Sequence, residues 1–190
     1  MPKPLAIEIV VPTPDGGERA VRITNPDRVM YPATDRTPEV TKAMVAEYLA
    51  AVGEPMLRIL RGRPTALERW PGGVHPGMRL AQGPQDKDAD GFYQKRLMKG
   101  APDYARTARI TFPSGRTADE ICPSEIAVAL WCAQMGTITF HPWPVRQTAD
   151  PRSLDLPDEL RIDLDPQPGT SFADVVRVAG VARDTFAELG

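Results

Sequence analysis

Hydrophobic and polar residues alternate over several stretches of the chain, a pattern typical of β-strands with one buried face. Residues 5–11 (LAIEIVV) precede an Asp-Gly-Gly turn and the alternation of Val21 and Ile23, which together predict an N-terminal β-hairpin. A second hairpin is predicted over residues 105–121, with its turn at 113–115. Shorter strands are expected in the stretches TALERW (65–70), GFYQKRL (91–97) and TITFHPW (137–143).

Between these strands, apolar residues recur at helical spacing. Thr37, Pro38 and Glu39 supply an N-cap, a first-turn proline and a first-turn acid, so a helix is predicted from there to about residue 60, with a bend at Pro55. Residues 123–135 are apolar nearly all round and end at a glycine, which predicts a buried helix.

A final helix is predicted to open at a capping box formed by Ser171 and Asp174. Its apolar residues form one stripe: Phe172, Val175, Val176, Ala179, Ala182, Phe186 and Leu189. The length of 190 residues suits one domain, and the elements together predict a single domain over residues 1–190 of the α/β (α+β) class.

Two aspartates stand one residue apart in the stretch LRIDLDPQPGT, residues 160–170. If this stretch is a strand, Asp163 and Asp165 point to the same face, with their Cα atoms about 7 Å apart. Carboxylate oxygens at this spacing suit Mg²⁺ or Mn²⁺. Two other interpretations stay open on these residues alone: a solvent-facing strand edge that carries two acids, and the D-x-D motif of a glycosyltransferase.

Charge is distributed unevenly along the chain, although the net charge is only −2. Residues 58–116 hold twelve lysines and arginines against five acids, a local balance of +7. The excess of basic residues in this segment predicts a surface that binds phosphates. The alternative is a basic face that only contacts solvent. Cys122 and Cys132 have no metal or redox spacing and are expected to be reduced core residues.

No apolar run of 18 residues occurs, and the N-terminus lacks the pattern of a signal peptide. We therefore expect no membrane partner and a cytoplasmic protein. His75 lies in a loop rich in glycine and proline and is interpreted as a surface residue.

Five blocks in a fixed order carry a resemblance to a known family: ITNPDRVMYP, GRPTALERWPGGV, GFYQKRL, SEIAVALWCAQMGTITFHPW and LRIDLDPQPG. They are similar to the polymerase domain of bacterial DNA ligase D, of the archaeo-eukaryotic primase superfamily, and cover nearly the whole chain from Ile23 onward. The resemblance implies a primase-polymerase fold with a mixed sheet flanked by helices. It also implies a metal-dependent nucleotidyltransferase (a DNA polymerase or primase) that uses nucleoside triphosphates at DNA ends and gaps in non-homologous end joining.

Position by position, the resemblance assigns roles to several residues. Asp163 and Asp165 resemble two of the family's three carboxylates that bind two Mg²⁺ or Mn²⁺ ions, and His141 resembles the histidine that contacts the triphosphate. Because residues alternate along a strand, His141 is expected to face away from Phe140. The remaining residues resemble nucleic-acid contacts: Asn25 and Arg28 for the 5′-phosphate of a gap, and Arg69, Phe92, Tyr93 and Lys95 for the template and primer.

The chain departs from the family pattern in two places. A second phosphate-binding lysine of the family corresponds to Pro38 here, with Arg36 as the nearest substitute. The later family segment with the third acid is not found, so we expect this chain to be the N-terminal and central part of such a domain and a weak or inactive polymerase alone. The alternative function is a catalytically incomplete module that binds DNA ends and 5′-phosphates. The resemblance also implies an end-binding protein and a ligase as protein partners, and the cytosol or nucleoid of a bacterium as the location.

Overall fold

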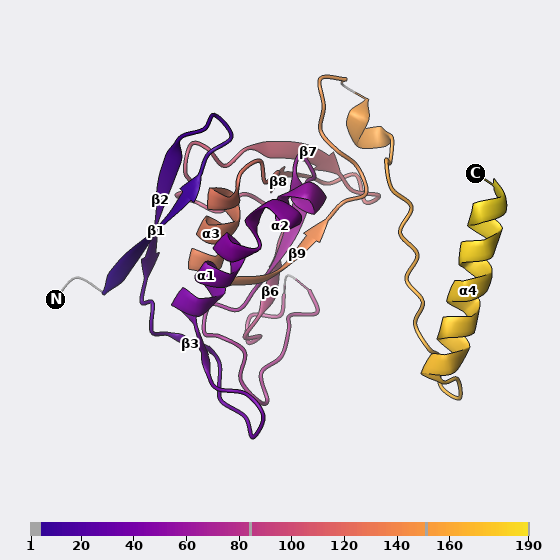
Figure 1. The fold of residues 1–190 in the computed structure, drawn as a ribbon, viewed down its shortest axis with the longest axis horizontal. Coiled ribbons are helices and arrows are strands. Elements are labelled where there is room, and N and C mark those ends of the chain that lie inside the picture. Colours follow the sequence, from indigo (N-terminus) through magenta and orange to yellow (C-terminus); the bar gives the residue numbers. More distant parts are fainter. Residues whose placement is uncertain (1–4, 84, 151, 190) are drawn as a thin grey trace. The chain divides into compact units, whose positions relative to one another are not determined.

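A computed structural model describes residues 5–83, 85–150 and 152–189, and its contacts divide the chain into two units, Met1–Asp158 and Glu159–Gly190. Figure 1 shows the elements along the chain. The first unit holds thirteen elements among its described residues: β1 (Ala6–Pro12), β2 (Glu18–Thr24), β3 (Val29–Tyr31), β4 (Val40–Thr41), α1 (Lys42–Ala51), α2 (Gly53–Leu60), β5 (Thr65–Arg69), β6 (Phe92–Gln94), β7 (Thr107–Thr111), β8 (Thr117–Ile121), α3 (Ile126–Gln134), β9 (Thr137–Pro142) and the short 3₁₀-helix η1 (Ser153–Asp155). The second unit holds α4 (Phe172–Leu189).

The predicted N-terminal hairpin is confirmed. Strands β1 and β2 pair antiparallel in continuous register, with Ile9 opposite Val21. The alternation places Val11, Val21 and Ile23 in the core, each at most 3% exposed. The hairpin therefore covers one side of the first unit through its apolar face.

A five-stranded sheet forms the centre of the first unit, with strand order β6-β5-β8-β7 and with β9 also paired to β5. The pairings between these strands are antiparallel. The hairpin predicted around residues 113–115 is confirmed as β7 and β8, and the three shorter predicted strands are β5, β6 and β9. Strand β5 thus brings β6 and β9, far apart in the sequence, to its two sides.

Helix α3 is the centre of the core, as its nearly uniform apolar sequence predicts. Its residues Ala127, Val128, Ala129 and Leu130 are fully buried. One side packs with the hairpin and α1, and the other packs with Leu67 of β5 and neighbouring residues. The helix is therefore enclosed between two apolar layers, and Gly136 follows it with a φ of 82°, the left-handed conformation of a helix-terminating glycine. Cys122 and Cys132 are buried free thiols, as predicted.

The first long helix differs from its prediction in its start and its break. The cap is Thr41, whose side-chain oxygen accepts from the Met44 N–H at 3.4 Å, and not Thr37. The reason is that Val40 and Thr41 pair with β3, so the chain is extended until residue 41. The helix ends at Val52, and α2 starts at Gly53, where a Cβ would lie 3.3 Å from Ile126 of α3. The break thus comes before Pro55, which α2 accommodates in its first turn.

The second unit contains the predicted C-terminal helix but not the predicted strand. Ser171 and Asp174 form the capping box: the Ser171 N–H donates to Asp174 Oδ2 at 2.7 Å and the Asp174 N–H donates to Ser171 Oγ at 3.4 Å. The apolar stripe of α4 is not buried, and Phe172 is 77% exposed. Residues 160–165 belong to no strand of the described chain, so the strand predicted there is wrong. An alternating sequence becomes a strand only when a neighbouring strand accepts its hydrogen bonds.

Among the described residues, no helix combines the length and the apolar character needed to cross a membrane.

Candidate functional site

Three polar and aromatic side chains meet on the outward face of the central sheet. Strand β5 places Glu68 opposite Tyr93 of β6, and it pairs Ala66 with His141 of β9. The rings of Tyr93 and His141 lie edge to face, with centroids 5.4 Å apart and planes at 70°. Glu68 Oε2 lies 3.5 Å from His141 Nε2. We call Glu68, Tyr93 and His141 the outward triad.

Alternation along β9 explains why His141 belongs to this face. Phe140 packs against the buried clusters around α3, whereas the side chain of His141 is 44% exposed. The prediction that these two neighbours face opposite sides is therefore confirmed. An exposed imidazole beside a carboxylate can donate a proton to an anion and orient it.

Glu68 is a member of the triad that sequence reasoning missed. Its side chain accepts a hydrogen bond from Trp70 Nε1 at 2.7 Å. Burial raises the pKa of Tyr31, and the negative charge of Glu68 adds to this rise. The alternating sequence TALERW would have placed Glu68 outward, because Leu67 is 2% exposed. Its proximity to His141, by contrast, depends on the pairing of β5 with β9, which no local pattern reveals.

Arg69 and Phe92 point to the other face of the sheet, against α3. The Arg69 guanidinium donates to the Met135 carbonyl from Nε at 2.9 Å and from Nη2 at 2.7 Å, and from Nη1 to Gln94 Oε1 at 3.1 Å. Its Cζ lies 5.1 Å from the centre of the Phe92 ring, and burial lowers the pKa of Arg69. The four predicted template and primer contacts are thus split between two faces. Tyr93 and Lys95 remain outward, and a nucleic-acid role for Arg69 and Phe92 stays a prediction.

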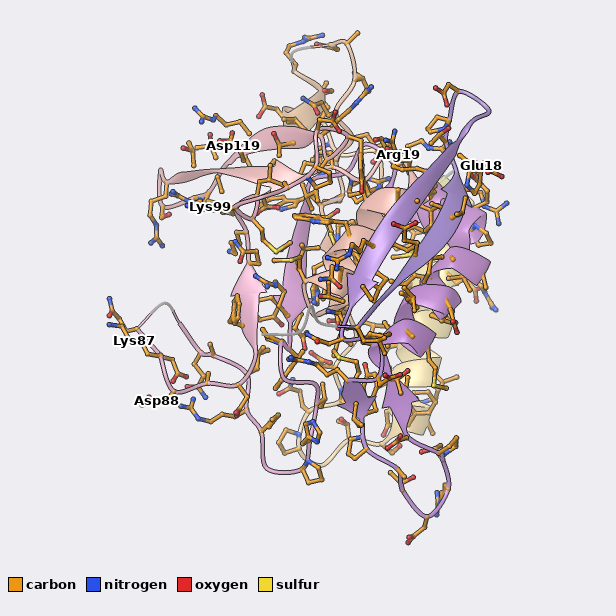
Figure 2. The ribbon with its side chains drawn as sticks, turned by 90° about the vertical axis from the view of Figure 1, so that its left-hand side faces the viewer. Glu18, Arg19, Lys87, Asp88, Lys99 and Asp119 are labelled. Atoms are coloured by element: carbon orange, nitrogen blue, oxygen red, sulfur yellow. The ribbon has the colours of Figure 1, made fainter. Side chains whose placement is uncertain are left out.

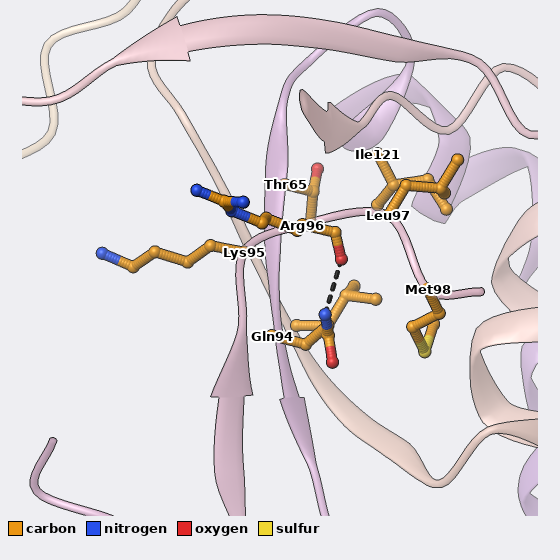
Figure 3. A pocket seen from close by; sticks show the side chains of 8 residues that line it. Thr65, Gln94, Lys95, Arg96, Leu97, Met98 and Ile121 are labelled. Carbon is orange, nitrogen blue, oxygen red and sulfur yellow. Dashed lines mark hydrogen bonds between the residues drawn. The ribbon is translucent and has the colours of Figure 1, made fainter. Parts of the chain in front are cut away.

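Lys95 is exposed just beyond the end of β6. Its Nζ lies 4.6 Å from the centre of the Phe112 ring. Figure 3 shows a small hollow next to it, in which the side chains of Lys95 and Arg96 extend to one side while Leu97 and Ile121 lie on the other. Gln94 Nε2 donates to the Arg96 carbonyl at 2.6 Å and so fixes the turn of the chain. The two cations are therefore presented outward from an apolar base.

Part of the basic charge predicted to meet phosphates is neutralised within the fold. Arg63, fully buried, forms a two-pronged ion pair with Asp158, and Arg79 and Arg109 form similar pairs with Asp86 and Asp119. Figure 2 shows Lys87 and Asp88 together at the end of a projecting loop. The local balance of +7 therefore overstates the charge that is available to a polyanion.

A second cluster of cations lies where the β2–β3 turn meets the start of α1. Asn25 adopts a φ of 50° in this turn, and Arg28 Nη1 donates to the Pro71 carbonyl at 2.6 Å. Lys42, the first residue of α1, is 7% exposed, and its Nζ donates to the Thr24 carbonyl at 3.0 Å. Burial, together with the nearby Arg28 cation, lowers the pKa of Lys42 to about 8. We call Asn25, Arg28 and Lys42 the turn cluster.

The sequence interpretation put Pro38 at the position of a second phosphate-binding lysine, with Arg36 as the nearest substitute, and it stays a prediction, but the cation that lies beside Arg28 is Lys42. The main-chain N–H of Lys42 donates to the Arg28 carbonyl at 2.8 Å, which ties the two cationic residues together. Pro38 and Arg36 lie before β4 in an exposed loop. Lys42 was missed because a cation with a buried stem looks, in sequence, like any polar residue of an amphipathic helix.

Asp163 and Asp165 lie in the second unit and are exposed in a segment without regular structure. Arg161, the nearest cation in sequence, forms an ion pair with Glu159 at 2.6 Å. Nowhere in the described parts of the chain do three or more His, Cys, Asp or Glu side chains gather as a metal site would require. The pair offers hard oxygen donors of the kind that Mg²⁺ and Mn²⁺ prefer, and its metal role stays a prediction.

Comparison with known proteins gives a consistent result. The sequence profile of the LigD primase-polymerase domain matches residues 41–190. The chain is 34% identical over 177 residues to the multifunctional non-homologous end joining DNA repair protein LigD of Mycobacterium tuberculosis, and 29% identical over 171 residues to the LigD of Pseudomonas aeruginosa. These matches cover 91% and 90% of this chain, but 21% and 18% of the relatives.

The fold agrees with this relationship. The polymerase domain from M. tuberculosis ligase D, solved in complex with DNA, matches with a TM-score of 0.66 and 31% identity, over 88% of this chain and 54% of that one. Sequence and fold therefore agree on the class of domain, the primase-polymerase fold. The chain belongs to the LigD primase-polymerase domain family. It spans about a fifth of the length of the curated relatives that it matches.

Proposed function

We propose that this chain transfers nucleotides from nucleoside triphosphates to the 3′ ends of DNA, at gaps and breaks that are repaired by non-homologous end joining. The observation that carries the proposal is membership of the LigD primase-polymerase domain family. The solved relative binds DNA, which supports DNA as the polymeric substrate. Family membership also argues against the glycosyltransferase interpretation, because the D-x-D motif was the only feature that supported it.

In this proposal, the carboxylates of Asp163 and Asp165 hold Mg²⁺ or Mn²⁺. When bound, such ions activate the primer 3′-hydroxyl and offset the charge of the leaving pyrophosphate. The two residues are exposed, so their oxygens can approach a cation without displacing a packed neighbour. A second metal of the family's two-metal site needs a further acid beyond this pair.

The outward triad is the proposed nucleotide site. His141 presents an imidazole to the triphosphate, and Tyr93, 47% exposed, presents a ring on which a base can stack. Lys95 lies two residues after Tyr93 in the sequence and supplies a cation for the phosphate backbone of the DNA strand. Stacking without a hydrogen-bonding pattern accepts any base, as gap filling requires.

The turn cluster is the proposed binding site for the 5′-phosphate of a gap. Arg28 offers a planar guanidinium and Lys42 an ammonium, and the two repel each other until an anion lies between them. The N-terminus of α1, where Lys42 is the first residue, adds the favourable end of a helix dipole. The proposed protein partners are an end-binding protein and a ligase, and the proposed location is the cytoplasm, where the relatives' bacterial chromosome lies.

Primer extension tests the proposal. We expect the chain to extend a primer weakly on a gapped duplex with a 5′-phosphate in the presence of Mn²⁺, and Asp163→Asn to remove this residual activity. Asp184→Asn, on the exposed surface of α4, is the matched control and should leave extension unchanged. Equal extension by the wild type and Asp163→Asn would contradict the assigned metal role.

A second candidate function is a DNA-end-binding module without catalysis. The observation that favours it is that the described residues contain no group of three metal-binding side chains, whereas the turn cluster is already assembled. Binding to the gapped duplex that is lost on changing Arg28, in a protein without any Mn²⁺-dependent extension, would establish this function in place of the first. The slope of the binding constant with salt concentration, on logarithmic axes, would then give the number of phosphate contacts.

A further inference from the structure

The carboxylate of Glu68 is held by Trp70, a residue that has no part in the proposed nucleotide site. Glu68 Oε1 accepts the Trp70 Nε1–H at 2.7 Å, while its other oxygen, Oε2, lies 3.5 Å from His141 Nε2. The side chain of Glu68 is 19% exposed, so both oxygens are largely screened from water. The carboxylate therefore bridges an indole that is fixed in the fold and an imidazole that faces solvent.

Trp70 is well anchored and makes Glu68 a rigid support. Its side chain is 7% exposed, and its main-chain N–H donates to the Gly136 carbonyl at 2.7 Å. Gly91 lies flat against the ring: a Cβ there would come within 2.5 Å of Trp70 Cδ2. Since neither the indole nor the strand can shift freely, the direction of the Glu68 carboxylate is set before any ligand arrives.

The arrangement favours one tautomer of His141. A carboxylate only accepts hydrogen bonds, so a hydrogen on Nε2, the nitrogen 3.5 Å from Glu68 Oε2, suits this contact. Tyr93 contacts the imidazole edge to face, which limits rotation of the ring. With Nε2 directed at Glu68, Nδ1 is the nitrogen left to donate to a phosphate. Neutral imidazole carries a single N–H, so a ring that donates to both Glu68 and a phosphate must be the imidazolium.

We propose that Glu68 is a positioning residue for His141: its carboxylate, fixed by Trp70, holds Nε2 in the protonated form and serves as the counter-ion of a cationic imidazole that receives the triphosphate. The inference rests on the proposed nucleotide site. Glu68 does not touch the nucleotide in this account and acts only through His141.

Glu68→Gln distinguishes this role from simple packing. The amide oxygen still accepts from Trp70, but the amide nitrogen then faces His141 and can only donate. In the neutral ring the proton must therefore move from Nε2 to Nδ1. We expect the side-chain ¹⁵N spectrum at alkaline pH to report an Nε2–H tautomer in the wild type and an Nδ1–H tautomer in Glu68→Gln. The chain has two histidines, so His75 serves as the internal reference.

Glu120→Gln is the matched control. Glu120 also lies on a strand of the sheet, is fully buried and accepts from a tryptophan, Trp143 Nε1, at 2.9 Å, but it has no histidine partner among the described residues. The Glu120→Gln substitution should leave the ¹⁵N spectrum of His141 unchanged. An unaltered His141 tautomer in Glu68→Gln overturns the proposal, and so does an equal change in Glu120→Gln.

Nucleotide binding gives the second readout. In calorimetric titrations with Mg·ATP, Glu68→Gln should weaken binding roughly tenfold, as expected for the loss of one charge-assisted contact, and in His141→Ala the same substitution should add nothing further. Where extension is measurable, the apparent KM for the nucleotide should rise with little change in kcat. Stronger binding by Glu68→Gln would show that the carboxylate merely repels the triphosphate. Absence of ATP binding by the wild type would count against the proposed function, while the tautomer measurement would still decide the role of Glu68.

Discussion

The outward triad and the segment that carries Asp163 and Asp165 differ in what holds their side chains. Glu68, Tyr93 and His141 stand on three hydrogen-bonded strands, and their distances follow from strand register. Asp163 and Asp165 stand on a segment that belongs to no strand of the described chain. The triad is therefore preorganised by the strands of the first unit, whereas no strand register fixes the directions of Asp163 and Asp165.

The largest difference between the two regions should appear in stability. Leu130 is fully buried in α3, so Leu130→Ala should lower the free energy of unfolding of the first unit by about 3 kcal/mol through lost burial and a residual cavity. Denaturant titration followed by tryptophan fluorescence measures this, since Trp70, Trp131 and Trp143 all lie in the first unit. A loss under about 1 kcal/mol would mean that α3 is not the centre of the core.

Gly91→Ala should have the next largest effect. The added Cβ would meet the Trp70 ring at 2.5 Å, and overpacking of this kind costs about 1–3 kcal/mol. Because Trp70 holds Glu68, the substitution should also disturb the His141 imidazole, which a ¹⁵N spectrum detects. Gly83→Ala, where a Cβ has open space, is the control and should preserve both stability and spectrum.

Binding of a 5′-phosphate should depend on pH through Lys42. The pKa of Lys42 is lowered to about 8, so in the free protein its ammonium loses its proton as the pH rises through that value. A phosphate binds the ammonium and not the neutral amine, so affinity should fall above pH 8, reaching a loss of roughly tenfold. Fluorescence anisotropy of a 5′-phosphorylated gapped duplex measures this.

Lys42→Arg is the control for this pH dependence, because a guanidinium stays charged throughout the range. It should retain binding and lose the decline above pH 8. The same decline in Lys42→Arg and in the wild type would assign the titration to another group and remove Lys42 from the turn cluster.

The smallest effect is expected for Leu160→Ala, the same substitution as in α3 but placed three residues before Asp163. Leu160 is 74% exposed, so its truncation should change the free energy of unfolding by less than about 0.5 kcal/mol. The contrast with Leu130→Ala measures directly how differently the two regions are built. A cost above 1 kcal/mol would show that Leu160 is covered in solution.

Alternation predicted the strands of the first unit well, and the contrast with residues 160–165 shows why. TITFHPW and LRIDLDP have similar patterns, but among the described residues a neighbouring strand pairs with the first and none pairs with the second. Pattern therefore predicts which residues share a face, whereas the existence of a strand depends on a distant partner. The Thr41 cap was misplaced for the same reason, because pairing with β3 keeps residues 40–41 extended.

The candidate site was predictable to the extent that it follows from the family resemblance. His141 and Tyr93 lie together on the outward face, whereas Arg69 donates to the Met135 carbonyl, and the roles that the resemblance gives these residues stay predictions. Sequence reasoning did not single out Glu68 and Lys42. What distinguishes them is contact with residues distant in the sequence, His141 for Glu68 and Arg28 for Lys42. Local patterns give the face of a residue, but only tertiary pairing gives its chemical environment.

We propose that Asp163 and Asp165 hold the catalytic cation of this primase-polymerase domain. Paramagnetic broadening by Mn²⁺ in amide NMR spectra tests this role, with Asp184 of α4 as the internal reference. We predict that substoichiometric Mn²⁺ broadens the signals around residues 163–165 before those around Asp184, and that Asp163→Asn with Asp165→Asn abolishes this selectivity. Equal broadening throughout, or selectivity unchanged in the double variant, would contradict the claim.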